Sequence, residues 1–347
     1  MLVLQLLVWS LVAAAGTLIV WKGSGLLESA SNSLSTHYGL PDIVQGALIV
    51  AVGSSFPELS TVVLSTLVHG EFELGVAAIV GSALFNILVI PGLSGLTPKH
   101  QLTTNRDLVY KEGQFYLIAL AVLLLTFSLA AIYNPLSSAN GAIRGELGRG
   151  LALLPLALYA VYVFMQYQDT IDHVPDGERA RIRPWVQWLR LGIALTAILI
   201  GVEGLVRAAV RFGDLLNTPG FLWGVTIVAA GTSIPDAFVS VRAARQGRGL
   251  TSTANVLGSN VFDLLCCIPI GILIAGSAQI NFSVAVPLLA TLILATFVLF
   301  LMMRTKMLLS RGECWILLSL YGLFVVWITL ESFGVIDLVR HLPPTGS

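Results

Sequence analysis

The 347-residue chain is 56% hydrophobic and only 11% charged, with a mean hydropathy of +0.87 and equal numbers of acidic and basic residues. Soluble domains carry about 25% charged residues, so this composition excludes an ordinary soluble protein and indicates an integral membrane protein. The zero net charge argues against a nucleic-acid partner. The three cysteines lie in apolar stretches without zinc-like spacing, so we expect buried free thiols.

Ten apolar stretches are long enough to cross a bilayer, which needs about 20 residues. The first stretch lacks the basic start of a signal peptide, so we expect it to be retained as a span. In chain order the stretches are residues 3–27, 43–68, 74–96, 113–133, 150–167, 188–212, 220–243, 250–277, 281–303 and 313–335. The sequence therefore predicts an all-α membrane protein with ten transmembrane helices.

Two segments of the first half return in the second half. GALIVAVGSSFPELSTV at 46–62 returns as GVTIVAAGTSIPDAFVS at 224–240, and GSALFN at 81–86 returns as GSNVFD at 258–263. Small residues in membrane helices serve close packing, so we expect that role for the glycines of these segments.

The duplication divides the chain into two repeats around a polar stretch. We expect a first five-helix repeat at 1–167 (duplicated segment 46–92), a cytoplasmic linker at 168–187 and a second five-helix repeat at 188–347 (duplicated segment 224–270). Five spans are an odd number, so the second repeat must enter the membrane upside down. The predicted architecture is a pair of inverted repeats.

Basic residues orient the spans, because Lys and Arg concentrate on the cytoplasmic side of a membrane. With the N-terminus outside, thirteen of them fall in inner loops and five in outer loops. We therefore expect a multi-pass protein of the plasma membrane with both termini outside. The lipid bilayer is its expected environment, and no obligatory protein partner is evident.

Three acids lie inside the duplicated segments, at Glu58, Asp236 and Asp263. Acidic side chains within membrane spans are expensive, and their usual explanation is function. Pro57 and Pro235 directly precede the first two acids, and proline removes a backbone hydrogen bond. We expect both helices to be broken at the midplane, with backbone oxygens left unpaired beside the acids.

Oxygen-bearing side chains share these helical faces with the acids. The candidate set is Ser54, Ser55 and Glu58 with Ser82 and Asn86 in the first repeat, and Thr232, Ser233 and Asp236 with Ser259 and Asp263 in the second. Oxygen ligands suit a hard cation such as calcium or sodium. The absence of imidazole and thiolate from this set argues against zinc or copper.

These residues resemble the calcium/cation antiporter superfamily, specifically the sodium/calcium exchangers. The two alpha-repeats of that family carry G-[ST]-S-x-P-[ED] and G-S-[NA]-x-F-[ND], and both motifs occur here in both halves. The resemblance covers essentially the whole chain. It implies that the candidate set above ligates the transported ions, and that backbone oxygens near Ala51 and Ala229 bind sodium.

Two departures from the commonest exchanger pattern resemble the potassium-dependent branch. Ala83 stands where many members have Asn, and Asp236 stands where many have Glu; the branch links the acid equivalent to Asp263 to potassium. Three carboxylates balance one calcium plus one potassium, but protonated Asp263 with calcium alone, or several sodium ions, would balance as well. Potassium co-transport is therefore a hypothesis.

The sequence predicts a secondary antiporter that exchanges sodium for calcium by alternating access, without a cofactor. A proton/calcium exchanger remains an alternative, and a cation channel is a further one. No Ser/His pair, HExxH motif or buried catalytic His supports an enzyme. Outside the motifs, we expect Glu203 to pair with Arg207, and His69, Glu71 and Glu73 to form a solvated turn.

Overall fold

The computed structural model describes residues 1–38, 54–97, 102–137, 143–170, 183–305, 307–336 and 338. Within these ranges nine helices are long and apolar enough to cross a membrane, and a shorter apolar helix occupies Phe56–Leu67. The expected second span, 43–68, is described only from Ser54 onward. The all-helical membrane architecture predicted from the sequence is thus confirmed.

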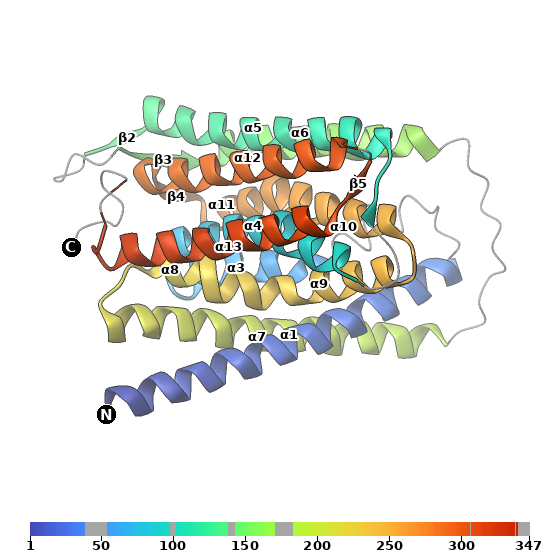
Figure 1. Cartoon of the computed structure of the whole chain (residues 1–347). Coiled ribbons are helices and arrows are strands. Elements are labelled where there is room, and N and C mark those ends of the chain that lie inside the picture. Colours follow the sequence, from blue (N-terminus) through green and yellow to red (C-terminus); the bar gives the residue numbers. More distant parts are fainter. Residues whose placement is uncertain are drawn as a thin grey trace.

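The helices run side by side along one direction and form a single bundle (Figure 1). Those of the first half are α1 (Leu2–Tyr38), α3 (Phe56–Leu67), α4 (Phe72–Gly95), α5 (Gly113–Tyr133) and α6 (Arg149–Thr170). Those of the second half are α7 (Pro184–Leu216), α8 (Gly220–Trp223), α9 (Ala229–Arg245), α10 (Gly249–Phe262), α11 (Ile268–Ala275), α12 (Phe282–Arg304) and α13 (Arg311–Ser332). Three π-helical segments, η2 (Asp107–Glu112), η3 (Gly224–Val228) and η4 (Asp263–Cys267), join α-helical ones.

Helix α4 lies at the centre of the bundle. Nearly all of its side chains are buried, and it packs against α3, α9, α10, α12 and α13. A helix that is apolar all round belongs inside a bundle rather than at its surface. Peripheral helices such as α1 and α13 instead expose large apolar side chains such as Leu11 and Leu323, as lipid-facing surfaces do.

The two longest helices, α1 and α7, pack against each other in opposite directions. Gly16 of α1 meets Gly201 of α7, whereas Gly23, further along α1, meets Ile198, earlier in α7. Helix α1 extends eleven residues beyond the expected span end at residue 27. It continues because Leu27, Ala30 and Leu34 keep an apolar stripe of helical period that remains buried.

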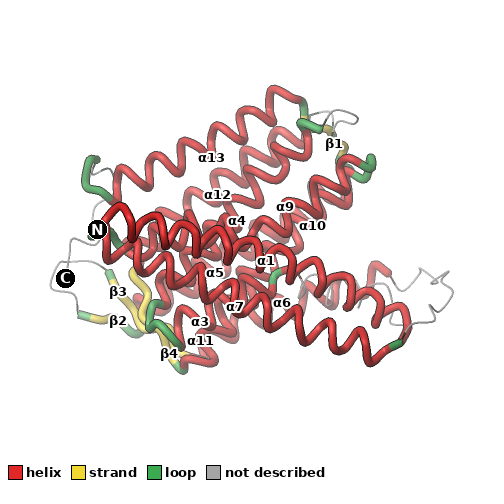
Figure 2. Tube along the Cα trace, turned by 90° about the horizontal axis from the view of Figure 1, so that it is seen from below, coloured by secondary structure: helices red, strands yellow, loops and turns green. Residues whose placement is uncertain are grey.

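Two small antiparallel sheets, which the sequence did not predict, lie at opposite ends of the bundle (Figure 2). At one end β1 (Leu102–Thr103) pairs with β5 (Leu308–Leu309). At the other end β3 (Arg144–Gly148) lies between β2 (Pro135–Leu136) and β4 (Ser277–Asn281). Both sheets join a segment of the first half to a segment of the second.

The helix around Pro235 differs from the expectation. Helix α9 continues through Pro235 without a break, and the departure from α-helical bonding lies upstream, in η3. Pro235 itself removes one helical N–H and crowds the carbonyl of Gly231, which lies within α9 and downstream of η3. In the first half α3 begins at Phe56, with Pro57 in its first turn, where a missing N–H costs no helical bond.

Candidate cation-binding site

The three acids predicted from the sequence lie in the interior of the bundle. Glu58 is in the first turn of α3, Asp236 is in the middle of α9 and Asp263 begins η4. Each side chain is at most 1% exposed. Their like charges act on one another, because Glu58 is repelled by both aspartates. No basic side chain pairs with these acids in the described ranges, so their burial is costly, and such a cost usually indicates function.

Glu58 is bonded through a hydroxyl of α4 to the second half of the chain. The Ser82 hydroxyl donates to Glu58 Oε1 at 3.3 Å, and its oxygen lies 2.7 Å from Ser233 Oγ. Thr232 lies within hydrogen-bonding reach of Glu58, although its hydroxyl also donates to Val228 O at 3.1 Å. One acid of the first half is therefore surrounded by hydroxyls of both halves.

Asp236 has the reciprocal arrangement. Asn86 of α4 donates from Nδ2 to Asp236 Oδ2 at 3.3 Å. Nearby, Ser54 Oγ lies 3.4 Å from Ser259 Oγ of α10. The two clusters expected from the sequence are thus interleaved, because residues of each repeat contact the acid of the other.

Asp263 has weaker partners within the bundle. The Cys267 thiol, one turn along, lies 3.7 Å from Asp263 Oδ1, and the same sulfur lies 4.0 Å from the backbone oxygen of Ser55. Cys267 is fully buried, as are Cys266 and Cys314, and none forms a disulfide. The expectation of buried free thiols is confirmed.

Four buried acceptor oxygens of this site have no hydrogen-bond partner in the part of the chain that is described. They are Glu58 Oε2, Asp236 Oδ1, Asp263 Oδ2 and Asn86 Oδ1. Leaving a buried acceptor unpaired costs roughly 1–3 kcal/mol, and more when it is charged. Each of the four is an oxygen with a free lone pair, which is the kind of ligand that a hard cation prefers.

The carboxylates do not form a compact metal cage by themselves. Within the described ranges, no group of three or more His, Cys, Asp or Glu side chains is arranged to hold a metal ion. A cation at this site would therefore also need hydroxyl, amide or backbone oxygens. The expected backbone oxygen of Ala229 accepts from Ser233 Oγ at 2.8 Å, whereas Ala51 lies outside the described residues.

Sequence reasoning missed Asn260, which lies between Ser259 and Asp263. Its Oδ1 accepts from Asn86 at 3.0 Å, and its Nδ2 donates to Ala83 O and to the Tyr116 hydroxyl, both at 3.2 Å. Asn260 could have been noticed as an amide side chain inside an apolar span, where burying an unpaired polar group costs free energy. Its partners could not be found that way, because Tyr116 is on another helix.

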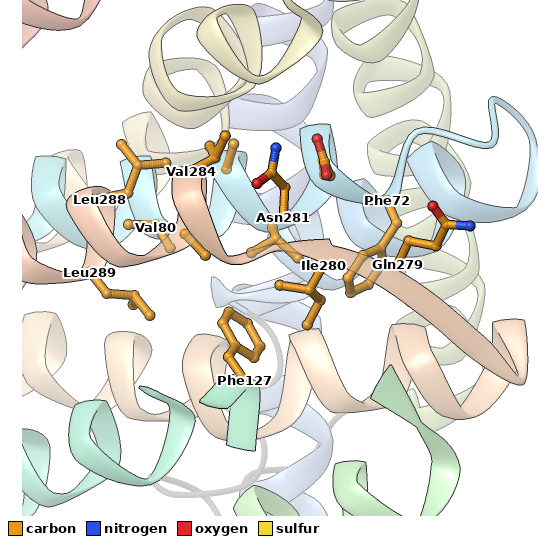
Figure 3. Close-up of a pocket in the computed structure, with 13 residues that line it drawn as sticks. Phe72, Val80, Phe127, Gln279, Ile280, Asn281, Val284, Leu288 and Leu289 are labelled. Atoms are coloured by element: carbon orange, nitrogen blue, oxygen red, sulfur yellow. The ribbon is translucent and has the colours of Figure 1, made fainter. Parts of the chain in front are cut away.

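A cavity of about 410 Å³ reaches the candidate site from one end of the bundle. It is lined by α1, α9 and Asn255 of α10, and both Ser54 and Asp236 contribute to its wall. At the other end, a cavity of about 30 Å³ lies among Phe72, Phe127 and neighbouring apolar side chains (Figure 3). No candidate ligand lines this second cavity, whereas the cavity between α1 and α9 reaches Ser54 and Asp236.

A separate polar contact joins the turn after α3 to α7, away from the acids. Arg207 donates from Nε to Glu203 at 2.5 Å, which confirms the expected pair. His69 was expected in a solvated turn, but its Nε2 lies 3.2 Å from Glu203 and its side chain is only 17% exposed. The fold brings these segments together, and sequence spacing could not indicate that contact.

Comparison with known proteins relates this architecture to one family. The family model described as "Sodium/calcium exchanger protein" matches residues 8–168 and 186–330. The sodium/calcium exchanger MaX1 of Methanosarcina acetivorans is 24% identical over 91% of this chain and 97% of its own length. Human sodium/potassium/calcium exchanger 5 is 26% identical over 69% of this chain and 64% of its own length.

A solved structure of the sodium-calcium exchanger NCX_Mj has the same fold. Its TM-score is 0.61 at 21% identity, and the match covers 92% of this chain and 99% of that one. The family match extends over most of the chain and includes every candidate site residue. The protein is a multi-pass membrane protein that belongs to the sodium/calcium exchanger family.

Proposed function

We propose that the protein is a secondary antiporter that exchanges sodium for calcium at the site around Glu58, Asp236 and Asp263. The observation that carries this proposal is the set of four buried oxygens, three of them on carboxylates, for which the described residues offer no hydrogen-bond partner. Family membership supports cation/calcium antiport as the general activity. Sodium and calcium both prefer oxygen ligands, so the two ions would compete for the same side chains.

Alternating access is the proposed mechanism, with residues 1–167 and 188–347 as inverted repeats. The opposite directions of α1 and α7, the first helix of each half, support this arrangement. The small sheets support it as well, since each end of the bundle has one that pairs the two halves. Transporters of this kind place their substrate site at the interface between the repeats.

Coupling would follow from the charge of the empty site. Three buried like charges repel one another, so the unloaded protein should not pass easily between its two open states. Either calcium or several sodium ions would neutralise the acids and permit the transition. Exchange, rather than leakage of one ion, is the consequence.

The proposed orientation has both termini outside the cell. Helix α1 begins and α13 ends at the same end of the bundle (Figure 1), while Arg242 and Arg245 lie at the opposite end, near the wide cavity. Basic residues favour the cytoplasmic side. In this orientation the cavity opens toward the cytoplasm and the structure is in an inward-facing state.

The test is calcium flux in liposomes that contain the purified protein, with sodium, potassium and proton gradients imposed separately. We expect an opposed sodium gradient to drive uptake of radioactive calcium, and Glu58→Gln and Asp236→Asn to abolish it. Glu146→Gln, on an exposed strand residue, is the matched control that should keep activity. Uptake driven by protons alone would instead establish the proton/calcium alternative, and full activity of either site variant would exclude the site.

Potassium co-transport is a second candidate, favoured by Asp263 at the position equivalent to Asn86. Its Oδ2 is buried and finds no partner in the part of the chain that the structure describes, and one aligned relative is a sodium/potassium/calcium exchanger. We expect potassium to stimulate sodium-driven calcium uptake, and Asp263→Asn to retain uptake while losing that stimulation. Uptake that is unchanged when an inert cation replaces potassium would contradict this assignment.

A further inference from the structure

The wide cavity has a polar wall on α1 that lies outside the duplicated motifs. Ser24 and Glu28 both line it, four residues apart and therefore on one face of the helix. Asp236 lines the cavity from α9. Two helices that belong to different halves of the chain thus contribute oxygen atoms to one space.

The side chains that line the cavity become less exposed from its rim toward Asp236. Arg242 and Arg245 at its rim are exposed, Glu28 is half-buried, and Ser24 and Asp236 are 4% and 1% exposed. Neighbouring charged side chains along the cavity interact electrostatically. Arg242 attracts the Glu28 carboxylate, and Glu28 repels Asp236. Glu28 therefore lies between the solvent-exposed rim and the deep acid.

A buried hydroxyl on this wall of the cavity distinguishes it from an ordinary solvent-exposed helix face. Ser24 Oγ is buried and has no hydrogen-bond partner among the described residues. A serine inside a helix commonly donates to the carbonyl four residues earlier, as Ser33 does to Ser29 O at 2.8 Å in the same helix. Asp236 Oδ1, which belongs to the deep site, is likewise buried and has no partner among the described residues. Both oxygens therefore keep free lone pairs for a cation that reaches them.

We propose that Ser24 and Glu28 form a transit site for calcium between the cytoplasmic solution and the deep carboxylates. The inference rests on the proposed function and extends it to a helix outside the repeated motifs. One carboxylate and one hydroxyl, with water completing the shell, bind calcium weakly compared with three acids, as a step on a path requires. The cavity volume of about 410 Å³ accommodates a hydrated ion.

Gly25 offers a reporter beside the site. It lines the cavity and is exposed, and a Cβ added there meets no atom within 4 Å. In Gly25→Cys, modification by a membrane-impermeant methanethiosulfonate from the cytoplasmic side should be slowed at least threefold by millimolar calcium. Choline at equal ionic strength is the reference for each variant. The chain without Gly25→Cys gives the background of its three buried cysteines.

Two double variants decide the assignment. Calcium protection should disappear in Gly25→Cys/Glu28→Gln and persist in Gly25→Cys/Asp236→Asn, because the transit site is distinct from the deep one. Protection that survives loss of Glu28, or that vanishes with Asp236, would overturn the proposal. Absence of sodium-driven calcium flux in the wild-type protein would overturn the antiporter function instead, and the labelling readout does not depend on flux.

Flux measured from each side separates transit from a structural role. In vesicles of defined orientation, Glu28→Gln should raise the KM for cytoplasmic calcium about fivefold or more and leave the KM on the opposite face unchanged. Ser24→Ala should act in the same direction, whereas Ser33→Ala, at a hydroxyl bonded to its own helix, should have no effect. Equal changes on both faces, accompanied by a lower melting temperature, would show that Glu28 only stabilises the fold.

Discussion

Asn260 illustrates how single polar residues hold the two halves together. Its side-chain amide bonds to Asn86 and Ala83 of α4 and to Tyr116 of α5, so the partners of this side chain among the described residues belong to the first half. Asn86 in turn donates to Asp236. The orientation of an amide beside the candidate acid therefore depends on a residue that is not itself a candidate ligand.

Replacing Asn260 by Ala should destabilise the protein and weaken transport. The substitution leaves Asn86 Nδ2, Ala83 O and the Tyr116 hydroxyl each without this partner, at a cost of about 1–3 kcal/mol for an unsatisfied buried group. We expect a lower melting temperature in detergent and a higher KM for calcium. Thr291→Val, which removes a hydroxyl bonded only to its own helix, is the control; an equal effect of both substitutions would refute a specific role for Asn260.

At the scale of elements, the contact between α4 and the segment η3–α9 places Ser82 beside Ser233 and Asn86 beside Asp236. Gly81 permits it, since a Cβ there would collide with the backbone of Val225 and lie 2.8 Å from Ala229 Cβ. The adjacent Ser82 then reaches Ser233. For the equivalent glycine of the second copy, Gly258, no atom of the described residues lies within 4 Å of an added Cβ, so within that part of the chain the expected packing role is found only for Gly81.

This asymmetry predicts opposite outcomes for two equivalent substitutions. Gly81→Ala should force α4 away from η3, at about 1–3 kcal/mol for overpacking, and should lengthen the Ser82–Ser233 contact. Its melting temperature and calcium flux should both fall. Gly258→Ala should leave flux unchanged and be neutral or stabilising, because Ala favours a helix interior. Comparable losses in both variants would disprove the inferred difference in packing.

At the scale of the whole molecule, polar and basic ends define how the bundle sits in the membrane. The beginning of α1 and the end of α13 lie together at one end, and the small sheet of β1 and β5 lies at the other (Figure 2). Exposed leucines of the peripheral helices lie between the two ends. A bundle of this kind can be inserted in either direction, and loop charge decides between them.

Reporter fusions test the proposed direction. Alkaline phosphatase, which is active only outside the cytoplasm, should be active when fused after residue 347. A green fluorescent protein inserted in the linker 168–187 should fluoresce, since that protein folds in the cytoplasm. As controls, the two reporters are exchanged: alkaline phosphatase in the linker should be inactive, and the fluorescent protein after residue 347 should not fluoresce. The reverse pattern would invert the orientation and make the wide cavity an extracellular opening.

The sequence by itself determined the membrane class, the approximate spans and the three acids. These features are local: a span is a run of apolar residues, and Glu58, Asp236 and Asp263 stand out because charge is costly within such runs. The repeated motifs also identified Ser82 and Asn86 as their companions. Family membership, inferred from the same motifs, is confirmed by the match over residues 8–168 and 186–330.

Tertiary structure alone decided which of these residues meet. Asn86 bonds to Asp236, and Ser82 contacts Ser233, only because α4 packs between helices of the second half; spacing along the chain carries no information on such contacts. The same holds for Asn260, and for Ser24 and Glu28, which reach the cavity because α1 lies against α9. It also holds for α9, which continues through Pro235, while the departure from α-helical bonding lies upstream in η3.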